Sequence, residues 1–144
     1  MSTSLKFTVR AASWQDDLAA LQDLRHRVFI IEQQVPEALE WDEADAVSVH
    51  ALALDAQQLP IGTGRLLPDG HIGRMAVVPQ WRRRGVGSAI LMLLIGCARQ
   101  QGHAAVHLHA QTRAIGFYAQ HGFVVHGNEF MDAGIPHRRM TLNW

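Results

Sequence analysis

The sequence predicts one mixed α/β domain that spans residues 1–144. Strand-like and helix-like patterns alternate along the chain in the order β α β β β α β α β β. Three neighbouring strand patterns in the middle are joined by turns, which indicates an antiparallel meander beside the helices. Hydrophobic residues make up 48% of the chain and charged residues 18%, and this composition is sufficient for one core of ordinary size.

The first third of the chain predicts a strand, a helix and an acidic segment. Residues 6–10 alternate as a short strand. Ser13, followed by Asp16 three residues later, predicts the N-cap of a helix that continues to about Phe29. The segment from Glu32 to Asp45 then holds six acidic residues and no basic residue.

Turn signals divide the rest of the chain into further elements. Gly102 and Gly122 follow helical patterns and are placed as helix stops. The expected elements are strands at 50–55, 61–67 and 71–78, a helix from about 85 to 102, a strand at 105–110, a helix from Thr112 to about His121, and closing strands at 123–126 and 137–142, joined by a loop with Gly134 and Pro136.

Charge and cysteine content exclude several classes of protein. The 13 basic and 13 acidic side chains balance to a net charge of zero, which argues against a nucleic-acid or membrane-surface partner. Cys97 is the single cysteine, so neither an internal disulfide nor a thiolate zinc site is expected. His107 and His109 share a strand face, but a predictable third ligand is missing and no metal is expected. We expect a cytoplasmic protein, because the start has no signal-peptide core and the longest apolar run is too short for a membrane span.

The segment Arg82-Arg83-Arg84-Gly85-Val86-Gly87 lies between a predicted strand and a predicted helix. Glycines at such a turn let the backbone approach a ligand, and the first N–H groups of a helix have no intrahelical acceptor. Together with the arginines they form a cradle that suits a pyrophosphate. The alternative interpretation is an exposed basic turn with ordinary glycine punctuation.

Two motifs carry a resemblance to a known family. Arg82-x-x-Gly85-x-Gly87, followed by Ala114-x-x-Phe117-Tyr118-x-x-x-Gly122-Phe123, resembles the GCN5-related N-acetyltransferase (GNAT) family, and the element order matches along nearly the whole chain. The resemblance implies a mostly antiparallel mixed sheet whose fourth and fifth strands splay apart and hold acetyl-CoA in the gap. The implied cofactor-binding residues are Met75, Ala76, Val77, Arg82, Arg83, Arg84, Gly85, Val86, Gly87, Ser88, Gln111, Ala114, Phe117 and Tyr118.

Tyr118 is the only tyrosine of the chain. In the family the matching hydroxyl lies near the thioester sulfur, where it stabilises or protonates the departing thiolate, so the resemblance implies a catalytic role. The alternative is a core residue, since most aromatic side chains on amphipathic helices serve in packing.

His137 is the candidate general base. The segment Gly127-x-x-Phe130-x-x-x-Gly134-Ile135-Pro136-His137-x-x-Met140 resembles the glyphosate N-acetyltransferase branch of the family, in which the matching histidine is the base. A base is useful because an alkylammonium is almost wholly protonated at neutral pH, and an imidazole can accept its proton. The alternative is a histidine at a strand start, hydrogen-bonded to a loop carbonyl.

The acceptor-binding residues are less strongly marked. Arg74 matches an arginine that binds a substrate anion in that branch, or it is a strand-face arginine paired with a surface carboxylate. Gln111 stands where the branch has arginine, so one anion contact is missing and glyphosate itself is not the expected substrate. The acidic segment resembles ElaA-like acyltransferases, and its Glu40 and Asp42 are candidates for substrate binding or for an alternative base. His109 faces the expected cofactor cleft.

These residues predict an acetyl-CoA-dependent N-acetyltransferase that acts by direct attack on a small-molecule amine. Two alternatives stay open, a protein or peptide N-acetyltransferase and a CoA-binding sensor without turnover. Apolar strand edges suggest a homodimer.

Overall fold

The computed structural model describes residues 6–35 and 42–144. Glu40 therefore lies outside the described residues. The elements are β1 (Phe7–Ala12), α1 (Leu18–Arg25), the π-helix η1 (His26–Glu32), the 3-10 helix η2 (Glu43–Val47), β2 (Val49–Asp55), β3 (Pro60–Leu66), β4 (His71–Val77), η3 (Pro79–Trp81), α3 (Val86–Gln100), β5 (Ala105–Gln111), η4 (Thr112–Ala114), α4 (Ile115–Gln120), β6 (Val124–Asp132) and β7 (Ile135–Asn143).

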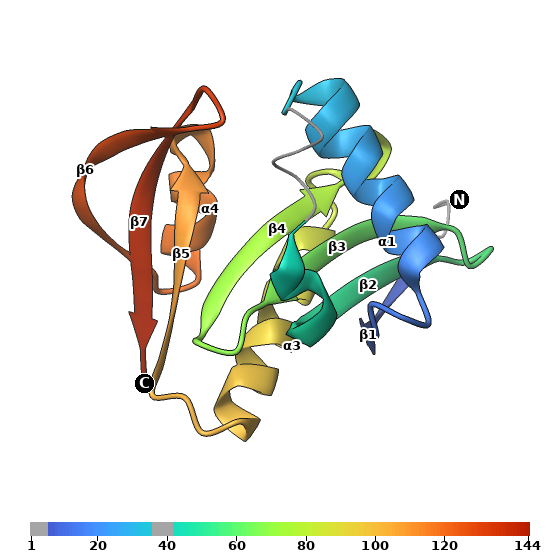
Figure 1. Cartoon of the computed structure of the whole chain (residues 1–144), viewed down its shortest axis with the longest axis horizontal. Coiled ribbons are helices and arrows are strands. Elements are labelled where there is room, and N and C mark those ends of the chain that lie inside the picture. Colours follow the sequence, from blue (N-terminus) through green and yellow to red (C-terminus); the bar gives the residue numbers. More distant parts are fainter. Residues whose placement is uncertain (1–5, 36–41) are drawn as a thin grey trace.

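Seven strands form one sheet in the order β1-β2-β3-β4-β5-β7-β6. Every neighbouring pair is antiparallel except β4 and β5, which are parallel. Figure 1 shows the sheet in two parts, with β1 to β4 beside α1 and with β5, β7 and β6 beside α4. The mixed, mostly antiparallel fold expected from the sequence is confirmed.

The two parts of the sheet meet where the beginning of β4 lies beside the middle of β5. Two residue pairs join these strands, His71 with His107 and Ile72 with Leu108, and the strands then separate (Figure 1). The predicted splay is therefore present, and it opens a gap between the second halves of β4 and β5.

A β-bulge lies in β4 where the gap begins. Gly73 pairs with Arg65 and Ala76 with Thr63, so Arg74 and Met75 lie opposite the single residue Gly64. Arg74 has a φ of 52°, in the left-handed region. A bulge leaves backbone groups outside the ladder and often adjoins a functional site. The backbone of Arg74 and Met75 is thus available beside the gap.

Helix α3 packs closely on one face of the sheet. A Cβ atom on Gly64 would lie 2.8 Å from Cγ2 of Ile90 and 2.9 Å from Cδ1 of Leu94, so this approach requires glycine. Side chains alternate between the faces of a strand, and Arg65 accordingly points to the other face, where it contacts Asp45.

The helix predicted from Ser13 to Phe29 differs in detail. Asp16 N–H donates to Oγ of Ser13 (3.0 Å), but Asp17 rather than Asp16 accepts from Ser13 N–H (3.2 Å) and the helix begins at Leu18. From His26 the α-helix widens into a π-helix, with Gln33 N–H bonded to the carbonyl of Val28 (3.0 Å).

The closing strands are longer than expected. Ala133 and Gly134 both have positive φ, 52° and 76°, and form a tight turn between β6 and β7 where the sequence suggested a loop. In the described part of the chain no helix combines the length and apolarity that crossing a membrane requires.

Candidate active site

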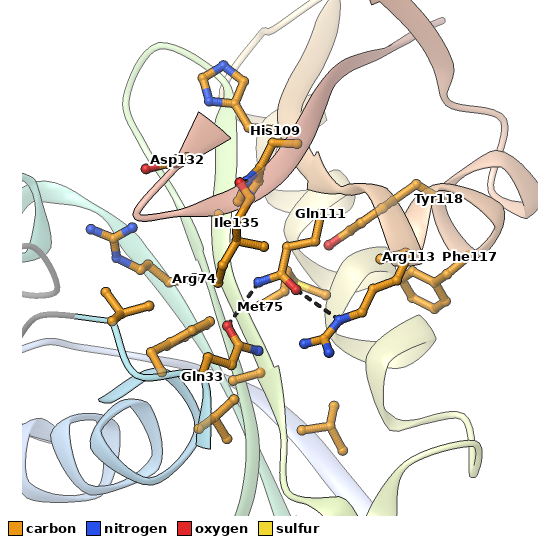
Figure 2. A pocket seen from close by; sticks show the side chains of 18 of the residues that line it. Gln33, Arg74, Met75, His109, Gln111, Arg113, Phe117, Tyr118, Asp132 and Ile135 are labelled. Atoms are coloured by element: carbon orange, nitrogen blue, oxygen red, sulfur yellow. Dashed lines mark hydrogen bonds between the residues drawn. The ribbon is translucent and has the colours of Figure 1, made fainter. Parts of the chain in front are cut away.

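A cavity of about 600 Å³ occupies the gap between β4 and β5. Its walls come from η1, the bulged part of β4, the end of β5, α4 and the β6–β7 hairpin (Figure 2). Of the expected site residues, those that line it are Arg74, Met75, Ala76, Val77, Arg82, Arg83, His109, Gln111, Ala114, Phe117, Tyr118 and His137.

The turn before α3 presents free backbone donors. Gly85 is the N-cap with a φ of 86°, and Arg83 also has a positive φ of 62°. The first backbone bond of the helix runs from Ala89 N–H to the carbonyl of Gly85 (3.1 Å). The amides of residues 86–88 therefore precede the hydrogen-bonded part of the helix and can donate hydrogen bonds to an anion.

The three arginines of this turn differ in their surroundings. Arg83 lines the cavity, and the guanidinium of Arg84 lies 5.8 Å from the ring centre of Trp81. Arg82 is held in place: Nη1 and Nη2 lie 2.7 and 2.6 Å from the Glu32 carboxylate, and Nε donates to the carbonyl of Val77 (2.8 Å). The paired guanidinium holds the pKa of Glu32 below its usual range despite partial burial. Arg82 thus ties η1 to the end of β4, and its charge is already countered.

Tyr118 lies in the cavity wall on α4. Its ring packs edge-on against Phe117 and Phe123, at centroid distances of 5.0 and 5.9 Å. Figure 2 shows its hydroxyl directed into the cavity towards Gln111. Burial raises the pKa of Tyr118 to about 12, so the hydroxyl stays protonated and can donate a hydrogen bond.

His137 is only 8% exposed and lines the cavity from β7. Nδ1 lies 2.7 Å from the carbonyl oxygen of Ile135, and since a carbonyl only accepts, Nδ1 carries hydrogen. In the neutral ring Nε2 then has the free lone pair. The ring stacks on Phe130 at 5.9 Å. The hydrogen bond to a loop carbonyl is thus present, and the tautomer it sets is also the one that a base would require.

Arg74 ends a chain of ion pairs that begins in the core. Asp45 and Arg25 are each 1% exposed, and Oδ1 of Asp45 lies 2.6 Å from Arg25 and 2.9 Å from Arg65. Arg65 also holds Asp42 with both terminal nitrogens (2.7 and 3.2 Å), and Asp42 lies 3.5 Å from Arg74.

This pairing argues against Asp42 as an alternative base. Burial opposes its charge, but Arg65 outweighs this and holds the pKa of Asp42 below its usual range. Asp42 also does not line the cavity. A carboxylate held by guanidinium groups is a weak proton acceptor.

Histidines gather where β4 and β5 meet. The ring centre of His71 lies 5.0 Å from that of His107 and 4.8 Å from that of His109. Burial and the neighbouring imidazoles lower the pKa of His71 to about 4, and burial with Arg139 lowers the pKa of His109. Both rings are therefore neutral near pH 7. Within the described ranges no group of His, Cys, Asp or Glu has the arrangement of a metal site.

A hydrogen bond crosses the open end of the gap. Nε2 of Gln111 donates to Oε1 of Gln33 (2.9 Å), and Nε of Arg113 donates to Oε1 of Gln111 (3.1 Å) (Figure 2). A second cavity of about 320 Å³ lies against the same residues. The sequence did not single out Gln33 and Arg113, since their partners become neighbours only after folding.

Comparisons with known proteins agree with this geometry. A sequence model of the acetyltransferase (GNAT) domain matches residues 14–144. An uncharacterised N-acetyltransferase of Bacillus subtilis (strain 168), YjcF, is 40% identical over 121 residues, which cover 81% of this chain and 86% of that protein. Among solved structures, an acyl-CoA N-acyltransferase from Pseudomonas aeruginosa has a TM-score of 0.82 and 27% identity, with 94% of this chain and 99% of the other covered. Escherichia coli ElaA has a TM-score of 0.81 and 26% identity, with 93% and 98% covered.

Proposed function

Because this chain belongs to the GNAT family and is an N-acetyltransferase, we propose that it transfers the acetyl group of acetyl-CoA directly to the amine of a small molecule. The observation that carries this proposal is that Tyr118 and His137 line one and the same cavity, beside the amides of the turn before α3. A proton donor and a proton acceptor in one cleft are what direct transfer requires.

The donor is proposed to lie along the bulged strand. Its pyrophosphate binds the amides of residues 83–88 and the side chain of Arg83, and its pantetheine arm follows Met75 to Val77. Arg84, whose guanidinium lies over Trp81, contributes charge at the edge of the cradle. Arg82 supports the turn through Glu32 instead of contacting the phosphates.

The proposed reaction needs one proton acceptor and one proton donor. Nε2 of His137 takes the proton of the bound ammonium, and the amine attacks the thioester carbonyl. The N–H of Met75, in the bulge and outside the β3 ladder, polarises that carbonyl oxygen. As the carbon–sulfur bond breaks, Tyr118 donates a hydrogen bond to the departing thiolate. The second proton of the attacking nitrogen passes to that thiolate, which leaves an amide and a thiol, and no covalent enzyme intermediate forms.

An acceptor survey with acetyl-CoA tests the proposal. The acceptors are amino acids, polyamines, simple alkylamines and peptides, and calorimetry measures the affinity for acetyl-CoA in parallel. We expect acetyl-CoA to bind and at least one small amine to be acetylated. Acetylation of peptides alone would indicate a protein acetyltransferase, and binding without turnover would indicate a sensor. A cytoplasmic location and a homodimer stay predictions from the sequence.

Tyr118→Phe is expected to lower kcat by roughly 10- to 100-fold, the value of one hydrogen bond to a charged group, with little change in the KM for acetyl-CoA. Phenylalanine keeps the packing against Phe117 and Phe123 and loses only the hydroxyl. Steady-state kinetics at saturating acetyl-CoA measure the effect.

Because Tyr118 is the only tyrosine, tyrosinate absorbance reports its ionisation directly. We expect almost no signal at pH 10 in the folded enzyme, since the pKa is raised to about 12. Full activity of the Tyr118→Phe variant would show that Tyr118 serves only in packing.

A further inference from the structure

Asp132 is the one carboxylate among the described residues that line the 600 Å³ cavity. Three residues of the acidic segment, whose Glu40 and Asp42 are candidates for substrate binding, are held by arginines. Glu32 binds Arg82, Asp42 binds Arg65, and Asp45 binds Arg25 and Arg65. Their charges are therefore already countered in the folded chain.

The β6–β7 ladder brings Asp132 close to the proposed base. Asp132 pairs with Ile135 and Phe130 pairs with His137. Paired residues share a face of the sheet, as do residues two apart on one strand. The stacking of Phe130 on His137 agrees with this. Asp132 and His137 are thus diagonal neighbours on one face, about 7 Å apart.

The same face continues onto β5. His137 pairs with Gln111, and Ile135, His109 and Gln111 line the cavity together with Asp132. Figure 2 shows Asp132 and Arg74 on one side of the view and Tyr118 on the other, with Gln111 between them. A molecule whose amine lies at His137 can therefore extend towards Asp132, away from the hydroxyl that serves the thiolate.

The basic side chains at this end of the cavity are not paired with Asp132. Arg74 lies on the same side of the cavity in Figure 2 and is engaged by Asp42 at 3.5 Å. His71 and His109 are neutral near pH 7 because their pKa values are lowered, and Arg139 is exposed on β7 opposite His109. No ion pair of Asp132 with another described residue is present. A carboxylate at a cleft attracts and orients a cation.

We propose that Asp132 binds a second positive charge of the acceptor, so that the preferred substrates are small diamines in which one nitrogen reacts at His137 and the other pairs with Asp132. This assignment rests on the proposed acetylation of a small-molecule amine and names the substrate class of the same cavity.

Three amines with the same five-carbon chain test the assignment. The far end is an ammonium in cadaverine, a methyl group in n-pentylamine and a carboxylate in δ-aminovalerate. In the wild type we expect kcat/KM for cadaverine to exceed that for n-pentylamine by about fivefold. Asp132→Asn should remove this preference by raising the KM for cadaverine, with no change in the kcat for cadaverine. Both constants for n-pentylamine should stay as in the wild type. The preference should also shrink as salt is added.

Glu129→Gln is the matched control. Glu129 carries the same charge on the same strand but does not line the cavity, so the preference should persist in this variant. Equal kcat/KM for cadaverine and n-pentylamine, a preference for δ-aminovalerate, or an equal loss with all three amines in Asp132→Asn would each overturn the assignment. So would failure of all three amines with an enzyme that acetylates another member of the acceptor survey. The proposed function itself fails when acetyl-CoA does not bind or when no small amine in the survey is acetylated.

Discussion

His137→Asn is expected to lower kcat/KM by roughly 100- to 10,000-fold, the usual contribution of a positioned general base. The asparagine amide can still donate to the carbonyl of Ile135, as Nδ1 does now at 2.7 Å, but it has no basic nitrogen. The acid limb that a base imposes on the pH profile of kcat/KM should disappear. The rate should then follow the fraction of free amine and rise until the amine itself is deprotonated. Steady-state kinetics across the pH range measure both effects.

A second histidine provides the control. His126 lies exposed on β6 and does not line the cavity, so His126→Asn should leave the profile unchanged. If His137→Asn kept both its rate and its acid limb, the proton would leave through another group or a water chain. His109 would then be the next candidate, because it lines the same cavity and its lowered pKa keeps it neutral.

The fold could be predicted from the sequence because its signals are local. Gly102 and Gly122 follow helical patterns, and both have positive φ, 90° and 91°, at the helix ends. Val106 and Leu108 alternate with His107 and His109, and the first two are buried, at 0% and 2% exposure. Period and turn residues are contained in short windows of sequence, so the element order was correct throughout.

Features that depend on distant partners were not predictable in this way. Nothing near Arg82 in the sequence indicates that Glu32, fifty residues earlier, takes its guanidinium. The Gln33–Gln111 bond joins residues 78 apart. The sequence made Glu40 and Asp42 candidates for substrate binding, yet Asp42 and Asp45 bind arginines of α1 and β3. Composition gives the charges of a segment, and only the fold gives their partners.

The motifs predicted two residues of the cavity, Tyr118 and His137, but not its carboxylate. Tyr118 and His137 carry family patterns, and both line the cavity. Asp132 has no such pattern. It reaches the cavity because the β6–β7 turn is tight and the strands extend to it. The β6–β7 ladder places Asp132 beside His137. The shorter strands expected from the sequence ended before Asp132 and therefore did not include this part of the ladder.

Asp45→Asn is expected to lower the free energy of unfolding by about 3–5 kcal/mol, the usual cost of removing one partner from a buried ion pair. Asp45 is 1% exposed and lies between two guanidinium groups, at 2.6 Å from Arg25 and 2.9 Å from Arg65. The amide would remove the negative charge that the two guanidinium groups share in the core. Urea denaturation at pH 7 measures the loss as a lower midpoint.

The pH dependence provides a second readout of the same charge. Burial opposes ionisation, but the hydrogen bonds and charges of Arg25 and Arg65 prevail and lower the pKa of Asp45. A lowered folded-state pKa gives stability that is fully present above the unfolded-state pKa of about 3.9 and is lost as the pH falls through the folded-state value. The wild type should therefore lose stability below about pH 4, and Asp45→Asn should lose less over that range.

The exposed pair between Asp23 and Arg27 gives the comparison. Their side chains are 62% and 46% exposed, and Asp23→Asn should change the free energy of unfolding by less than about 1 kcal/mol. Equal effects of the two variants would show that the buried pair contributes no more than a surface pair. In that case desolvation would offset the attraction between Asp45 and its arginines, and the chain of ion pairs from the core to Arg74 would fix geometry without adding stability.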